Sequence, residues 1–250
     1  MIQKNEVLIA GRALWEFGAK MVAFPEITTD VDSAVFQGLE RSSIQLLHLR
    51  QAGMHMDCEI DYFGTLTERD RHRSELEAIL ITAMEPVVID YGDGYFYRAV
   101  LEKNPSVNSK NDVFTEVGYR FRVTRHTDPV ILEIMDGEFN FFCQSNVPLT
   151  DCLISIPPLT TWPDLNVLLN FGTPQRQEFT LDMTPTGGIV LDGISKIFKM
   201  NGSNITNHDK FTWTTFPALK PGDNQILIST EGVLGTLTQP VQIYYTPTYL

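Results

Sequence analysis

The stretch Val117-Gly-Tyr-Arg-Phe-Arg-Val123 decides the fold class, because its side chains alternate between apolar and charged. In an extended chain Tyr119, Phe121 and Val123 share one face, and Arg120 and Arg122 share the other. A period of two is typical of a β-strand that buries one face against a core. The sequence therefore predicts a strand over residues 113–125.

Strand patterns also dominate the region upstream of this stretch. The segment Tyr91-Gly-Asp-Gly94 supplies the glycines that a tight hairpin needs for positive φ angles. We therefore expect Val87–Tyr91 and Tyr95–Leu101 to be the two arms of a hairpin. Other β-branched or aromatic runs bounded by turn residues predict strands over Ile44–Arg50 and Met54–Phe63.

One helix is predicted, from about Glu68 to Met84. Thr67 is the expected N-cap, with Asp70 three residues later completing a pattern like a capping box. The apolar residues Leu76, Ile79, Leu80 and Ala83 recur at helical spacing and predict a buried stripe that covers one face of a sheet. The arginines at 69, 71 and 73 are expected to be solvated.

The composition changes near Asp128–Pro129. Downstream, short strand patterns recur every 8–12 residues or so between Pro, Gly, Thr and Asn, which indicates a sandwich or jelly roll. The predicted fold class is mainly β (α+β), with an N-terminal sheet domain over residues 1–133 and a β-sandwich over residues 134–250. Its strands are expected at Cys152–Ile156, Asn166–Asn170, Gln177–Met183, Ile189–Leu191, Lys196–Met200, Phe211–Thr214, Gln225–Ser229 and Thr238–Tyr245.

The charge balance argues against several classes of partner. The 250 residues hold 19 Lys and Arg against 31 Asp and Glu, a net charge of −12. Nucleic-acid binding draws its affinity mainly from cations that displace counterions, so stable nucleic-acid binding is not expected. The three cysteines, Cys58, Cys143 and Cys152, are odd in number and form no CxxC motif. This pattern predicts that the protein is synthesised in a reducing compartment and that its thiols are buried. No apolar run is long enough to predict membrane insertion.

The familiar signatures of catalysis are missing from the sequence, which has no phosphate-binding loop, GxSxG elbow or HExxH motif. His48, His55, Cys58 and His72 come closest to a metal set, but His55 and Cys58 point to opposite faces of a strand. Asp90 and Asp93 are expected to serve the hairpin turn, since Asp bonds turn backbone. We predict no catalytic, cofactor or metal site, and we place the carboxylates Glu133, Asp136 and Glu138 in the connection between the domains.

Two tryptophans bear on binding. Trp213 alternates with Phe211 in a predicted strand and is expected in the core. Trp162 precedes Pro163 in a predicted loop, where an exposed ring would offer a contact for a glycan or a protein.

The C-terminal part of the sequence resembles a known protein family. The segment Phe216-Pro-Ala-Leu-Lys-Pro-Gly-Asp-Asn-Gln-Ile-Leu-Ile-Ser229, followed by Val241-Gln-Ile-Tyr-Tyr-Thr-Pro-Thr-Tyr-Leu250, resembles the end of the distal tail proteins (Dit) of long-tailed, non-contractile bacteriophages. The structural motif is carried by Leu219, Pro221, Gly222 and Asn224. A looser match covers the helix and the strand Tyr95-Phe-Tyr-Arg-Ala-Val-Leu101.

The resemblance implies a structural role. If the resemblance holds, the N-terminal domain of this chain would form a hexameric ring. The C-terminal domain would be a β-sandwich like those of galectins or carbohydrate-binding modules. The ring would join the tail tube protein to tip or baseplate proteins for host adsorption, after assembly in the bacterial cytoplasm. Two alternatives remain: a protein that binds host cell-wall glycans through the sandwich, and a hydrolase using Asp90 or Asp93.

Overall fold

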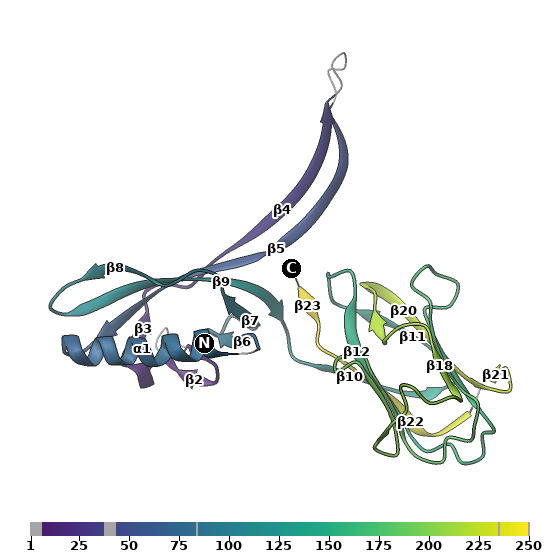
Figure 1. The fold of residues 1–250 in the computed structure, drawn as a ribbon. Helices are drawn as coiled ribbons and strands as arrows, with labels where there is room; N and C mark the ends of the chain where they lie inside the picture. The colour runs from purple at the N-terminus through teal and green to yellow at the C-terminus, as the bar shows by residue number, and fades with distance from the viewer. Residues whose placement is uncertain (1–6, 38–43, 84, 235, 250) are drawn as a thin grey trace. The chain divides into compact units, whose positions relative to one another are not determined.

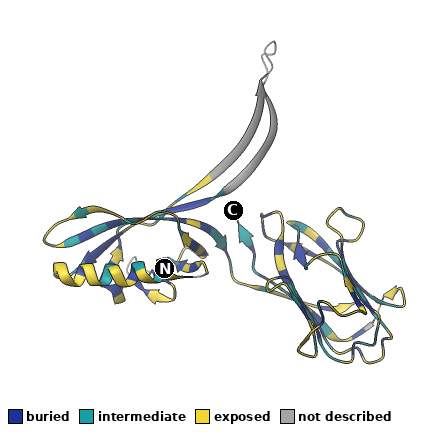
Figure 2. Cartoon of the chain, viewed as in Figure 1, coloured by how far each residue is buried: buried dark blue, intermediate teal, exposed yellow. Residues whose placement is uncertain are grey.

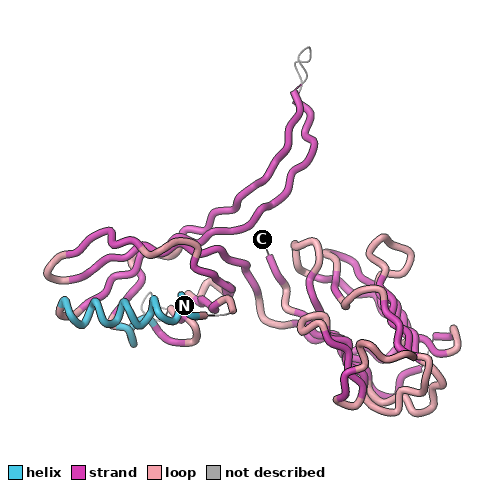
Figure 3. The backbone as a smooth tube through the Cα atoms, viewed as in Figure 1, coloured by secondary structure: helices cyan, strands magenta, loops and turns pink. Residues whose placement is uncertain are grey.

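The protein, a computed structural model, is described at residues 7–37, 44–83, 85–234 and 236–249. It is mostly β-structure with one helix of regular α geometry in this part of the chain (Figure 3). The chain divides into two compact units, with the division between Thr127 and Asp128. The predicted boundary at residues 133 and 134 falls inside a strand of the second unit.

The first unit is an antiparallel sheet with a helix on one face (Figure 1). Its strands follow the order β2-β1-β6-β7-β9-β5-β3, while β4 pairs with β5 and β8 pairs with β9. Its elements are β1 (Leu8–Ile9), β2 (Arg12–Ala13), the 3-10 turn η1 (Leu14–Phe17), β3 (Ala19–Met21), β4 (Glu26–Gln37), β5 (Ile44–Phe63), α1 (Leu66–Thr82), β6 (Val87–Asp90), β7 (Phe96–Leu101), β8 (Ser106–Lys110) and β9 (Phe114–His126).

The stretch that decides the fold class behaves as predicted. In β9, Tyr119, Phe121 and Val123 are buried on the helix side of the sheet, while Arg122 is exposed on the opposite face. The same alternation continues in β5, where Met56, Cys58 and Ile60 are buried beside them. Burial of these apolar faces contributes roughly 25 cal/mol per Å² removed from water, which fixes the register of the sheet.

The second unit is a sandwich of two antiparallel sheets. One sheet has the order β10-β22-β12-β15-β16-β17, with β19 on β12, and the other has β11-β20-β13-β14-β18, with β21 on β20. Their strands are β10 (Val130–Asp136), β11 (Glu138–Cys143), β12 (Thr150–Ile156), β13 (Leu165–Leu169), β14 (Gln177–Leu181), β15 (Ile189–Asp192), β16 (Ile197–Met200), β17 (Ser203–Asn204), β18 (Phe211–Trp213), β19 (Ala218–Leu219), β20 (Gly222–Thr230), β21 (Val233–Leu234) and β22 (Thr236–Tyr245). Strand β23 (Thr248–Tyr249) follows β22 and belongs to neither of these two sheets.

The core of this sandwich lies between the sheets, and exposed positions alternate with buried ones along the strands (Figure 2). The eight predicted strands of this half correspond to observed ones, within a few residues at each end. Glu133, Asp136 and Glu138 are not in a connection between domains, which corrects that prediction. They lie in β10 and β11, the strands from which Ile134 and Phe141 reach the core of the sandwich.

Candidate assembly site

Besides the short terminal strand β2, the described part of the first sheet has open edges on both of its sides. On one side of β9, β8 pairs with residues 115–118 and has no second partner strand in the described part of the chain. On the far side of β5, both β3 and β4 pair with it and are likewise open. An unpaired edge presents a row of backbone N–H and C=O groups that a strand of another chain can use.

A two-stranded ribbon extends one of these edges. Strand β5 is 20 residues long, but only its second half, from Met54 to Phe63, also pairs with β9. Residues 44–53 pair with β4 alone, so β4 and β5 leave the sheet together (Figure 1). An isolated two-stranded hairpin is marginally stable in water. This ribbon is therefore suited to contact with another chain.

The face of the sheet away from α1 holds a network of charged groups. The Glu102 carboxylate lies 2.8 Å from His55 Nδ1 and 3.2 Å from Arg120 Nε, and Arg120 also lies 3.6 Å from Asp57. Partial burial acts to raise the pKa of Glu102, but the hydrogen bonds from His55 and Arg120 outweigh it and hold this pKa below its usual range. Glu102 thus stays ionised and ties β7 to its neighbours.

A hollow of about 500 Å³ adjoins this network. Its lining comes from the β3–β4 connection, β5, β9 and the segment between β7 and β8, and it includes Glu26, Asp57, Glu59, Lys103 and Arg120. The mixed charge suits a polar protein contact. In the described residues no group of three or more His, Cys, Asp or Glu side chains is placed to hold a metal ion.

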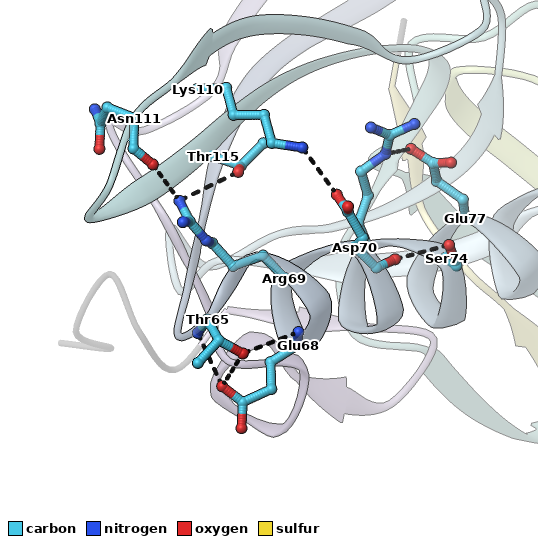
Figure 4. A network of polar contacts seen from close by, with 10 residues as sticks. Thr65, Glu68, Arg69, Asp70, Ser74, Glu77, Lys110, Asn111 and Thr115 are labelled. Atoms are coloured by element: carbon cyan, nitrogen blue, oxygen red, sulfur yellow. Dashed lines mark hydrogen bonds and ion pairs between the residues drawn. The ribbon is translucent and has the colours of Figure 1, made fainter.

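The helix is fixed to the sheet by a buried arginine (Figure 4). Arg69 is 2% exposed, and its Nη1 donates to the carbonyl of Asn111 at 2.8 Å and to Thr115 Oγ1 at 3.4 Å. Lys110 and Asp70 add an exposed contact at 3.5 Å. The predicted solvation of Arg69 is therefore wrong, because its position on α1 faces the turn between β8 and β9.

The helix begins earlier than predicted. The N-cap is Thr65, whose Oγ1 accepts from Glu68 N, while the Glu68 carboxylate accepts from Thr65 N at 2.8 Å. This is a complete capping box, two residues before the predicted Thr67. Of the predicted stripe, Leu76 and Leu80 are buried, Ile79 is packed against the core, and Ala83 is exposed.

The four residues of the structural motif form a rigid corner in the second unit. Leu219 is fully buried. Gly222, which follows Pro221, has a φ of 81°, a backbone conformation that favours glycine. Asn224 is 2% exposed; its Oδ1 accepts from Lys220 N at 3.1 Å and from Asn170 Nδ2 at 3.0 Å, and its Nδ2 donates to the Lys220 carbonyl. Asn224 therefore bonds the backbone of the turn.

The exposed ring expected at Trp162 is not observed. Trp162 is only 7% exposed and belongs to the core of the sandwich. The backbone N–H of Trp162 donates to the Leu159 carbonyl, so that a local turn precedes the inward-facing ring. A contact through Trp162 stays a prediction, and its burial gives that contact no support. Trp213 packs as expected, 5.1 Å from the ring of Phe198.

The remaining candidates have structural partners. Asp90 Oδ1 accepts from Gly92 N, and Asp93 accepts from Tyr95 N and from the Tyr97 hydroxyl at 2.6 Å, so both carboxylates hold the β6–β7 turn. His55 and Cys58 face opposite sides of β5 as predicted, and burial raises the pKa of the Cys58 thiol to about 12.

His72 lies on α1, and the side chain of His48 falls outside the described part of the chain. The helix in the described residues does not meet the length and apolarity that a membrane crossing requires.

Sequence reasoning missed the charged network; it favoured pairing between copies through strand edges of the N-terminal half, but it did not say which strands form those edges. The alternation that predicts β5 and β9 does place His55, Asp57 and Arg120 on one face. It does not say which strands are neighbours. Glu102 could not be assigned to this network without the pairing of β7 with β9.

Comparison with known proteins shows a fold likeness over the whole chain. The crystal structure of the Dit protein of phage SPP1, described as a paradigm of the hub adsorption apparatus in phages that infect Gram-positive hosts, matches with a TM-score of 0.71 at 14% identity. The match covers 98% of this chain and 99% of that one.

A second likeness is to the phage P2 baseplate in its activated conformation with Ca, with a TM-score of 0.54 and 6% identity over 94% of this chain and 92% of that one. No family model and no curated protein matches the sequence. The resemblance to Dit proteins and the mainly β fold are thus confirmed at the level of fold.

Proposed function

We propose that this chain is a structural hub protein of a phage tail, and that its first unit forms a closed hexameric ring. The observation that supports this most is the pair of open edges on opposite sides of one continuous sheet, β8 on one and β3 with β4 on the other. A ring needs heterologous contacts in which two different surfaces of one chain meet. The likeness to the SPP1 Dit protein, whose described role is that of a hub, agrees with this assignment.

The ring would close by strand addition. In each contact the β8 edge of one copy would lie beside the β4 edge of the next, so that the sheets continue from copy to copy. The charged face away from α1 would then form one side of the ring wall. The ribbon of β4 and β5 would gain the covering that a two-stranded hairpin needs.

The ring would serve as a connector in the virion. Its two rims would dock the tail tube protein on one side and tip or baseplate proteins on the other, after assembly in the host cytoplasm. This role needs no catalysis and no cofactor. The alternative of glycan binding loses its proposed anchor, since Trp162 is buried in the sandwich core.

Edge variants test the ring directly. Val107 on β8 is 47% exposed, so Val107→Lys leaves the fold intact while it places a charge on the open edge. Thr28→Lys does the same on β4. Both are expected to reduce the native mass of the protein, measured by light scattering, from that of the ring to that of smaller species.

The matched control is Val88→Lys. Val88 is 41% exposed on β6, which has a partner strand on both sides. The native mass of this variant should equal that of the wild type. If the two edge variants kept the wild-type mass, strand addition at these edges would be refuted.

A further inference from the structure

An exposed apolar tip projects from the second unit at the end where β20 finishes (Figure 1). Val233 and Leu234 form β21 and are 67% and 50% exposed. Met135 is 50% exposed on β10, a strand of the other sheet, which pairs with β22 at Asp136 and Thr236, two residues after Leu234. Single exposed apolar residues are ordinary, but a cluster of them at one projecting turn marks an interaction surface.

The tip is held in a rigid shape. Glu231 and Gly232 both have positive φ angles, 48° and 74°, as in the two-residue hairpin turns that match strand twist. A left-handed conformation is strained for a residue other than glycine. Asp164 offsets this strain, because its Oδ1 accepts from Glu231 N and from Thr230 Oγ1, both at 2.8 Å. The apolar side chains are therefore presented by a preorganised turn.

Carboxylates surround these apolar residues. Along one edge of β20, Glu138 pairs with Leu227, the Gly137 carbonyl accepts from Ile228 N, and β21 pairs with Ser229 and Thr230. Asp136 and Glu138 thus lie in line with the tip, beside Glu231 in its turn. Asp136, Glu138, Asp164 and Glu231 form no ion pair within the described part of the chain.

Lys and Arg residues are scarce in the second unit, and most of them lie away from the tip. Residues 128–250 hold five Lys and Arg against twelve Asp and Glu. Arg176, Lys196 and Lys220 lie at the opposite end of the sandwich, where Val130 pairs with Tyr245. Lys210 lies at the same end as the tip but beside β18, at the other edge of that sheet, and Lys199 lies on β16 in the other sheet. Arg176 and Lys196 are also neutralised by Glu178 and Asp151. The tip therefore combines exposed apolar groups with uncompensated negative charge.

We propose that this tip docks a basic protein segment in which Lys or Arg residues alternate with apolar ones. The apolar side chains of the segment would cover Val233, Leu234 and Met135, and its cations would meet Asp136, Glu138 and Glu231. Charge complementarity supplies the attraction, and burial of the apolar side chains supplies the anchor. The inference does not depend on the ring, because it concerns the second unit alone.

The probe is a short fluorescent peptide in which lysine alternates with valine, titrated with the full chain and followed by anisotropy. Binding is expected, with an affinity that falls as salt rises from about 50 to about 300 mM. The double variant Val233→Ser with Leu234→Ser, and the variant Glu231→Asn, should each weaken binding by about fivefold or more. Asparagine tolerates the positive φ at position 231.

Matched controls lie at the opposite end of the unit. Leu149→Ser removes an apolar side chain that is 53% exposed, and Asp223→Asn removes an exposed carboxylate. Both should leave the affinity within about twofold of the wild type. A peptide with glutamate in place of lysine, and one with serine in place of valine, should bind much more weakly.

A second measurement guards against misfolded variants. In the wild-type chain with labelled methyl groups, the peptide should shift the signals of Met135, Val233 and Leu234 and leave those of the sandwich core unchanged. The proposal is overturned if the lysine–valine peptide does not bind or if the tip variants bind it as well as the wild type. It is also overturned if the double variant abolishes only self-association of the chain, since the occupant would then be a second copy.

Discussion

Asp61 is a carboxylate that the fold removes almost entirely from water. It is 8% exposed, and its Oδ1 has no hydrogen-bond partner in the described part of the chain. The strand register places Lys20 on one side of it and Glu116 on the other. Burial, with Glu116 adding to it and Lys20 opposing, raises the pKa of Asp61 above its usual range.

This shift has a definite consequence for stability. The folded state holds the Asp61 proton more tightly than the unfolded chain does, so ionisation of Asp61 lowers the free energy of unfolding. The loss begins as pH rises through the usual pKa of an aspartate and is complete above the raised pKa. At neutral pH the ionised carboxylate is therefore a net cost to the fold.

Asp61→Asn is expected to raise the free energy of unfolding at pH 7, because it removes the buried charge. The difference from the wild type should shrink as pH falls through the raised pKa of Asp61, below which the wild-type carboxyl is also neutral. Urea unfolding across this pH range measures it. Asp57→Asn, which removes a carboxylate near Arg120, should give no such gain. A less stable Asp61→Asn protein at pH 7 would refute this account of Asp61.

Single residues also show where sequence reasoning stops. The turn roles of Asp90, Asp93 and Asn224 depend on neighbours within a few positions, and these were predictable. The burial of Arg69 and Trp162 depends on segments that lie far along the chain or fold back locally. Residue type alone favours exposure for arginine, so only the tertiary contact with Asn111 reveals the buried one.

At the scale of elements, α1 depends on its docking against the β8–β9 turn. Its surface beyond Leu76, Leu80 and Arg69 is largely exposed, so apolar burial alone holds little of it (Figure 2). Helices in proteins draw most of their stability from tertiary packing. The bond from Arg69 to the Asn111 carbonyl thus links the helix to the edge strand β8 and keeps that edge in place.

Arg69→Met should lower the free energy of unfolding by about 1–3 kcal/mol, because it leaves the Asn111 carbonyl and Thr115 without their donor. Chemical denaturation measures this loss. Arg71→Met is the matched control on the same helix, since Arg71 is 62% exposed and meets Glu75 at 3.5 Å. Its effect should stay within about 0.5 kcal/mol. Equal losses in the two variants would contradict the anchoring role of Arg69.

Element prediction succeeded where hydrophobic patterns are strong. The strands β6, β7 and β9, the β6–β7 hairpin and most of the sandwich follow from alternation and turn residues. The two strands predicted over Ile44–Arg50 and Met54–Phe63 are one continuous strand, β5. Strand β4 was not predicted, because Asp and Ser interrupt its β-branched residues and its pairing with β5 decides its conformation. The helix start was placed two residues late, since Thr65 and Thr67 are equally good caps by residue type.

At the scale of the whole molecule, two units of different character share one chain. The first has 14 Lys and Arg against 19 Asp and Glu over residues 1–127, and its helix-free face mixes both signs. The second is strongly acidic and presents the apolar tip. This division suits one unit that binds its own copies through strand edges and another that binds a different partner.

The central claim is that copies of this chain form a ring of six. The measurement that tests it most directly is the native mass of the wild-type protein by light scattering across a concentration series. The account predicts a species of about 170 kDa, six copies of the 28.3 kDa chain, that is stable or grows with concentration. A mass of 28.3 kDa at every concentration would contradict it.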